Sequence, residues 1–101
     1  MSKVKLPKQI TVGRSTYKIE AKKNLLDEDG TPLDCMGQIS FKQGSIKIST
    51  KYPAAEVRNT FWHEMTHAIL KDMGSKLEAD EKFVTAFSER LTNAILSARF
   101  D

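Results

Sequence analysis

The sequence predicts an α+β domain in which an antiparallel sheet of about four strands, arranged as two hairpins, packs against two α-helices. The first half of the chain alternates apolar and polar residues in short runs between glycine-containing turns, a pattern typical of half-buried strands. The second half repeats apolar residues at intervals of three and four, a pattern typical of amphipathic helices. A chain of 101 residues supports one modest core. We therefore expect a single domain over 1–101, with hairpins in 1–51 and helices in 52–101.

Two hairpins account for the first half. Residues 9–13 and 16–21 alternate apolar and polar side chains around a glycine-containing turn, and residues 37–41 and 45–49 do the same. Alternate side chains of a strand point to opposite faces, so one face of the second hairpin is expected in the core. Its serine and lysine side chains are expected to face water. The side chains expected in the core are Ile39, Phe41, Ile46 and Ile48.

A first helix is expected from Pro53 to about Met73. Proline suits the first helical position, Glu56 lies in the first turn, where a carboxylate is favourable, and Gly74 follows as a C-terminal cap. Apolar residues occupy most of its circumference, so we expect it to lie between the sheet and a further element. Its main apolar stripe consists of Val57, Phe61, Met65, Ala68 and Ile69.

A second helix is expected to begin between Ser75 and Ala79 and to run through Phe100. Residues 75–78, Ser-Lys-Leu-Glu, have the form of a capping box, but a start nearer Ala79 fits the sequence equally well. The connection between the helices is short, so we expect them to be antiparallel neighbours. The apolar stripe of the second helix consists of Phe83, Val84, Phe87, Leu91, Ala94, Ile95 and Ala98.

Composition and charge argue against several classes of protein. No apolar run approaches the roughly 18 residues that span a bilayer, so no membrane partner is expected. The basic segment 1–7 is not followed by an apolar run, so it is not expected to be a signal peptide. The net charge of +3 divides into +5 for residues 1–51 and −2 for 52–101, but the lysines are scattered without interleaved aromatic residues, so a nucleic acid is not the expected partner. The single Cys35 excludes an intramolecular disulfide and fits a cytoplasmic location.

The strongest indication of function is the sequence His-Glu-Met-Thr-His at residues 63–67. His63 and His67 are the two histidines of the chain. A four-residue step on a helix returns a side chain to nearly the same face, so the two imidazoles can bind one tetrahedral metal ion. Glu64 lies beside them, placed to act as a general base toward water. This HExxH pattern is typical of zinc (Zn2+) metallopeptidases.

A catalytic zinc site requires a third protein ligand in addition to two imidazoles. The candidates downstream of the motif are Glu78, Asp80, Glu81 and Glu89. On a helical wheel Asp80 lies near the centre of the second apolar stripe and Glu81 at its margin, whereas Glu78 and Glu89 point further away. The wheel slightly favours Asp80, and the longer reach of a glutamate favours Glu81. The residues alone leave both open.

Three segments together carry a family resemblance. They are residues 63–70 (HEMTHAIL), residues 80–84 (DEKFV) and the hairpin start at 37–39 (GQI). With them, the chain over about 34–98 resembles small phage-encoded HExxH metallopeptidase-like proteins, which are distantly similar to the ImmA/IrrE type of bacterial and phage metallopeptidase. The resemblance implies a minimal zincin-like fold, a catalytic zinc ion and a location in a bacterial or phage-infected cell.

The resemblance also implies the roles of individual residues. In such proteins the third ligand is an acid three residues before a small or branched apolar residue at the start of the next helix. That position is Glu81, ahead of Val84, so the resemblance makes Glu81 the preferred ligand and Asp80 the alternative. His63, His67 and Glu81 would bind the metal, and Glu64 would be catalytic. The substrate implied is a protein or peptide, such as a regulatory protein of a phage or its host.

One alternative belongs to a different functional class. The chain would then be a zinc-stabilised, non-catalytic phage accessory module that engages a host protein or nucleic acid through its basic N-terminal half. Three further side chains are candidates near a metal: Cys35 as an inhibitory thiolate, and Tyr17 or Tyr52 as donors to an oxyanion. For each of the three, ordinary packing is the preferred interpretation.

Overall fold

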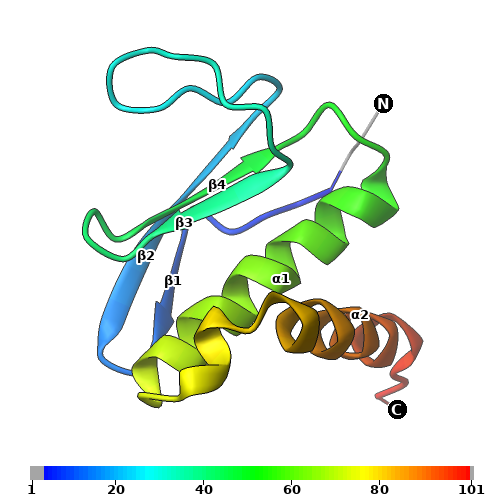
Figure 1. Ribbon diagram of the computed structural model, residues 1–101. Helices are drawn as coiled ribbons and strands as arrows, with labels where there is room; N and C mark the ends of the chain where they lie inside the picture. The colour runs from blue at the N-terminus through cyan, green and yellow to red at the C-terminus, as the bar shows by residue number, and fades with distance from the viewer. Residues whose placement is uncertain (1–3, 101) are drawn as a thin grey trace.

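A four-stranded sheet lies across one face of a long helix, and a second helix packs against that long helix away from the sheet (Figure 1). This arrangement comes from a computed structural model, which describes residues 4–100. Residues 1–3 and Asp101 lie outside the described residues. The prediction that segment 1–7 is not a signal peptide therefore falls partly outside them. The predicted α+β fold with two hairpins and two helices is confirmed. In chain order the elements are β1 (Gln9–Val12), β2 (Ser15–Lys22), β3 (Gly37–Ser40), β4 (Ser45–Ser49), α1 (Ala54–Asp72), a 3₁₀ turn η1 (Lys76–Ala79) and α2 (Glu81–Ser97).

The strand order is β1-β2-β4-β3. Each hairpin is antiparallel, as predicted, but the two hairpins meet through a parallel pairing of β2 with β4, in which Lys18 lies opposite Ser45 and Lys22 opposite Ser49. The sheet is therefore mixed rather than antiparallel throughout. This order places β4, the more apolar strand of its hairpin, between two neighbours, where Ile46 is completely buried.

The serines of β4 are buried, although alternation predicted that they face water. Ser45 and Ser49 are 8% and 2% exposed. The loop after β2 lies beside the C-terminal part of β4. There Ser49 Oγ donates to the Lys23 carbonyl at 2.9 Å, and Lys47 Nζ donates to the Leu26 carbonyl at 2.7 Å. Carbonyls of this loop thus satisfy two polar side chains that the alternation pattern assigns to solvent.

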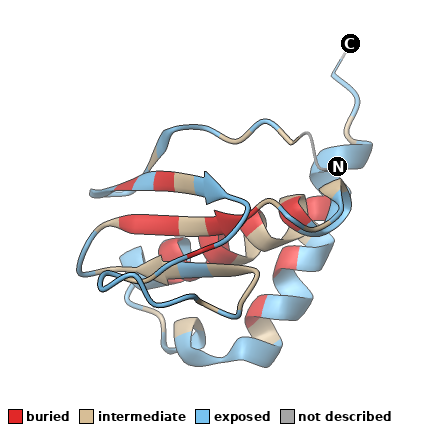
Figure 2. Cartoon of the chain, turned by 90° about the horizontal axis from the view of Figure 1, so that it is seen from above, coloured by how far each residue is buried: buried red, intermediate tan, exposed pale blue. Residues whose placement is uncertain are grey.

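The core lies between the sheet and α1. Figure 2 shows the buried residues gathered on the central strands and on the helix faces turned toward them. Burying one large aliphatic side chain contributes about 1.5–3 kcal/mol, so this layer fixes α1 against the sheet. The predicted stripe of α1 is confirmed except at Ile69, which is exposed. The core residues are Val12, Tyr17, Ile19, Ile46, Ile48, Val57, Phe61, Met65 and Ala68.

The ends of α1 follow the predicted signals. Pro53 directly precedes the helix and Met73 caps its C-terminus. Gly74 follows with φ of +69°, a backbone conformation that only glycine adopts without strain, and the chain reverses there. Within residues 4–100 neither α1 nor α2 combines the length and apolar character that crossing a membrane requires.

The second helix is shorter than predicted, because residues 76–79 form the 3₁₀ turn η1 instead of its first turn. Ser75 Oγ accepts a hydrogen bond from the Leu77 amide and caps this turn. Asp80 then caps α2, which ends at Ser97 rather than at Phe100. The predicted capping serine is thus correct, but it caps a separate short element.

The buried face of α2 also differs from its predicted apolar stripe. Val84, Ser88 and Thr92 are buried, whereas Phe87 and Ile95 are 45% and 42% exposed. The hydroxyls of Ser88 and Thr92 donate to carbonyls of their own helix, and these small side chains are the ones that α2 turns inward. Larger apolar residues therefore border an open groove of about 410 Å³ beside α1. Its apolar lining includes Ile69, Leu70, Met73, Phe83, Phe87 and Leu91.

Candidate metal centre

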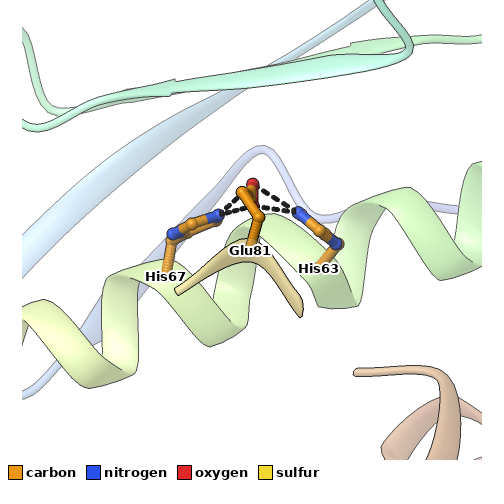
Figure 3. Close-up of side chains that lie close together, drawn as sticks. All are labelled: His63, His67 and Glu81. Atoms are coloured by element: carbon orange, nitrogen blue, oxygen red, sulfur yellow. Dashed lines mark hydrogen bonds and ion pairs between the residues drawn. The ribbon is translucent and has the colours of Figure 1, made fainter. Parts of the chain in front are cut away.

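α1 presents both histidines toward the segment that leads into α2 (Figure 3). His63 and His67 are one helical turn apart, and their ring centroids are separated by 5.2 Å. Their side chains are 22% and 11% exposed. The predicted histidine pair is therefore directed at the second helical segment, partly shielded from solvent.

Glu81, the first residue of α2, extends its carboxylate between the two imidazoles (Figure 3). Its oxygens lie 3.1 Å from Nε2 of His67 and 3.3 Å from Nε2 of His63. In the part of the chain that the structure describes, this is the one group of three or more His, Cys, Asp or Glu residues whose ligand atoms converge, all within 4.8 Å of one another. The structure thus brings the three predicted ligands together, while metal binding itself stays a prediction.

The donor set fits a tetrahedral metal ion. Two imidazole nitrogens and one carboxylate oxygen form a set used at catalytic zinc sites, where the fourth position is left for water. Ligand atoms about 2.0–2.1 Å from a tetrahedral zinc ion are roughly 3.3 Å apart. The distances of 3.1 and 3.3 Å between Glu81 and the two histidines agree with that spacing. The same donors suit other divalent ions, so this group could hold a metal ion, and its geometry does not identify which one.

Asp80, the alternative third ligand, lies outside this group. Its Oδ1 accepts a hydrogen bond from the Phe83 amide at 3.0 Å and caps α2. Such a cap stabilises a helix by about 1 kcal/mol. Asp80 therefore fixes the point at which α2 begins, and with it the position of Glu81.

Glu78 is a member of the site that the sequence reasoning missed. The helical wheel directed it away from the histidines, but its Oε2 lies 3.1 Å from Nδ1 of His67. The wheel failed because residue 78 belongs to η1, whose turn is tighter than an α-helix. The capping serine at Ser75 was the available signal, because it showed that a helical turn begins there. Glu89 lies further along α2 and is not part of the group.

Glu64 lies on the side of α1 that faces β3. It is 7% exposed. Gly37 at the start of β3 is so close that a Cβ added there would lie 3.4 Å from Glu64 Oε2 and 2.5 Å from Thr60 Cγ2. The predicted general base therefore lies between the histidines and an edge strand of the sheet.

The titratable groups of the site perturb one another. Burial raises the pKa of Glu64 above its ordinary value, against the opposing influence of the two histidines. Burial alone would lower the pKa of His67, but its hydrogen bonds and charge interactions with carboxylates, Glu81 foremost, outweigh burial and raise it. Burial alone would raise the pKa of Glu81, but its hydrogen bonds with both imidazoles lower it. In the metal-free protein, therefore, the geometry favours an ion pair between protonated His67 and ionised Glu81.

The other three candidate side chains lie outside the metal group. Tyr17 is buried in the core between sheet and helix, and Tyr52 is half-buried beside Lys51. Cys35 is half-buried in the loop between β2 and β3, where it lines a separate hollow formed by that loop. None of the three belongs to the group of converging ligand atoms.

Comparison with known proteins adds no relative to this description. The chain matches no protein-family model, no curated protein and no solved structure.

Proposed function

We propose that this protein is a zinc-dependent endopeptidase. The observation that carries the proposal is the convergence of His63, His67 and Glu81 within 4.8 Å, with Glu64 next to them on α1. A metal site alone would also suit a structural role. The adjacent buried glutamate is what distinguishes a hydrolytic arrangement, because a structural zinc site needs no general base.

A zinc ion supplies, when bound, a Lewis acid that polarises a carbonyl and makes water more acidic near neutral pH. His63, His67 and Glu81 are the residues that would hold it. Glu78 holds His67 through Nδ1 and thereby orients Nε2 of the same ring toward Glu81.

Glu64 is the proposed general base. Its pKa is raised by burial, which makes its carboxylate a better proton acceptor. It would take a proton from the attacking water and deliver it to the amine that leaves as the peptide bond breaks. Because Glu64 lies on the β3 side of α1, this proton transfer would occur next to the edge of the sheet.

The proposed substrate is an extended polypeptide bound along β3. This strand pairs with β4 on one side, and its other side is an edge of the sheet. Edge strands bind peptides by adding a strand through backbone hydrogen bonds. Gly37 lets β3 pass close to Glu64, so a peptide on this edge would lie near the base. By the resemblance in sequence, a phage or host regulatory protein is the proposed biological substrate.

The test compares the wild type with Glu64→Gln after both are loaded with zinc. A mixed peptide library is incubated with each protein, and cleavage products are identified by mass spectrometry. The wild type is expected to bind about one zinc per chain and to cleave peptides, and Glu64→Gln to keep the zinc and lose activity by about 10²–10⁴-fold. Equal cleavage by both proteins would exclude Glu64 as the base. A zinc-loaded wild type that cleaves nothing in the library would favour the non-catalytic binding module.

A further inference from the structure

The first half of α1 and the second half of α2 diverge (Figure 1). Residues of both segments line a cleft. Its volume is about 560 Å³, large enough for a long side chain of a bound peptide. Apolar contributions come from Met36, Ala55 and Leu96. The polar residues of its lining are Glu56, Asn59, Thr60, Glu89, Thr92 and Asn93.

The cleft adjoins the candidate active site. Thr60, on its wall, is the residue whose methyl group approaches Gly37, and it lies one helical turn before Glu64. Asn59, on the same wall, lies one turn before His63. Met36 directly precedes β3, so the edge strand begins at the mouth of the cleft. A peptide paired with β3 would therefore place a side chain near the opening.

The charge of the cleft has one sign. Glu56 and Glu89 are exposed carboxylates, and the lining contains no lysine or arginine. Within residues 4–100 neither glutamate forms an ion pair, since the ion pairs of that range involve only the two histidines with Glu78 and Glu81. Thr92 Oγ1, whose proton goes to the Ser88 carbonyl at 2.7 Å, also lies 3.3 Å from Asn59 Oδ1. The cleft thus offers two unpaired negative charges and amide groups that can accept hydrogen bonds from a cation.

We propose that this cleft is a specificity pocket for a lysine or arginine side chain of the peptide substrate, with Glu56 and Glu89 as the residues that select it. The inference rests on the proposed peptidase function, since it assigns the pocket to that substrate. A cationic side chain would gain charge-assisted hydrogen bonds there, whereas an acidic one would meet two like charges. The length of lysine and arginine suits a pocket whose carboxylates lie on opposite helices.

The test measures binding without cleavage. The protein carries ¹⁵N and the Glu64→Gln substitution, is loaded with zinc, and is titrated with the peptides Ac-Ala-Ala-X-Ala-Ala-NH₂. X is arginine, citrulline, which has nearly the same shape without the charge, or glutamate. The arginine peptide is expected to bind about fivefold tighter than the citrulline peptide, as for one or two exposed charge pairs. The chain has three asparagines, and the side-chain amide signals of Asn59 and Asn93 are expected to shift while that of Asn24 does not.

Variants assign the preference to the cleft. Glu56→Gln combined with Glu89→Gln is expected to remove the difference between the arginine and citrulline peptides, and Glu28→Gln, in the loop between β2 and β3, to preserve it. Equal affinity for the two peptides in the parent protein, or a preference that survives the double substitution, would overturn the inference. Cleavage assays with Glu64 restored then separate the two proposals. Binding at the cleft without cleavage would refute only the peptidase, and cleavage without basic preference would refute only the pocket.

Discussion

At Gly37 the start of β3 comes into close contact with α1. Replacement by alanine would place a methyl group 2.5 Å from Thr60 Cγ2 and 3.2 Å from the Lys47 carbonyl. We expect Gly37→Ala to lower the free energy of unfolding by about 1–3 kcal/mol, as overpacking does. Thr60→Ser removes the opposing methyl, so the double variant is expected to recover much of the loss. Urea unfolding of the four proteins in this cycle measures the coupling, and additive effects would show that the two groups do not meet.

Glu64 couples stability to pH in the metal-free protein. Its pKa is raised in the folded chain, so the folded state binds this proton more readily than the unfolded state. The stability it contributes is present below the ordinary glutamate pKa and is lost as pH rises through the raised value. Glu64→Gln is therefore expected to stabilise the metal-free protein at neutral pH, with no gain below about pH 4. Urea midpoints from pH 3.5 to 8 test this, and a gain that is constant with pH would contradict it.

Glu78 would act on a bound metal through its contact with His67. Carboxylates that hold the second nitrogen of a ligating histidine typically strengthen metal affinity by about 10–100-fold. Glu78→Gln is expected to weaken zinc binding toward the lower end of that range, and Glu78→Ala further. Competition with a chromophoric chelator measures the affinity, with Glu20→Gln on β2 as the charge-matched control. Unchanged affinity in both Glu78 variants would mean that the contact with His67 has no bearing on the metal.

At the scale of elements, metal ligation would link α1 to the start of α2. A ligand that binds only the folded state stabilises it by about 4 kcal/mol at 1,000 times its Kd. Removal of zinc with a chelator is thus expected to lower the melting temperature by more than about 10 °C. The amides of η1 and α2 are expected to exchange hydrogen faster, because α2 packs mainly on α1 and η1, whereas β4 amides keep their protection. An equal increase in the hydrogen-exchange rates of β4 and α2 amides would exclude a stabilising effect of the metal that is confined to the α1–α2 connection.

The elements also show how far sequence reasoning reaches. Both ends of α1 were predictable from local backbone chemistry, because Pro53 has a fixed φ and Gly74 adopts a positive φ that other residues avoid. The face of α2 was not, because apolar periodicity places Phe87 and Ile95 in the core, whereas α2 packs through the small Ser88 and Thr92. Packing distance between helices depends on both partners, and one sequence stretch does not encode it.

The residues of the candidate site also differ in how well the sequence predicted them. The histidine pair follows from a four-residue spacing on one helix, which is local information. Glu81 required a family resemblance to be preferred over Asp80, since the two acids are adjacent and only the geometry of the cap separates them. Glu78 was missed because a 3₁₀ turn and a first α-helical turn have nearly the same sequence signals. Sequence reasoning thus predicted the individual segments of the site but not the contacts between them.

At the scale of the whole molecule, the parallel pairing of β2 with β4 has a kinetic consequence. Each hairpin joins consecutive strands through a short turn, but Lys18 meets Ser45, 27 positions further along the chain, only after the loop between the hairpins has closed. Loop closure of this kind slows folding, so this pairing is expected to set the folding rate. Substitutions in β4 would then slow folding, whereas those on the outer face of α2 would mainly speed unfolding. The pairing of β4 with β2, which completes the sheet, is therefore also expected to determine how long the chain remains unfolded before it folds.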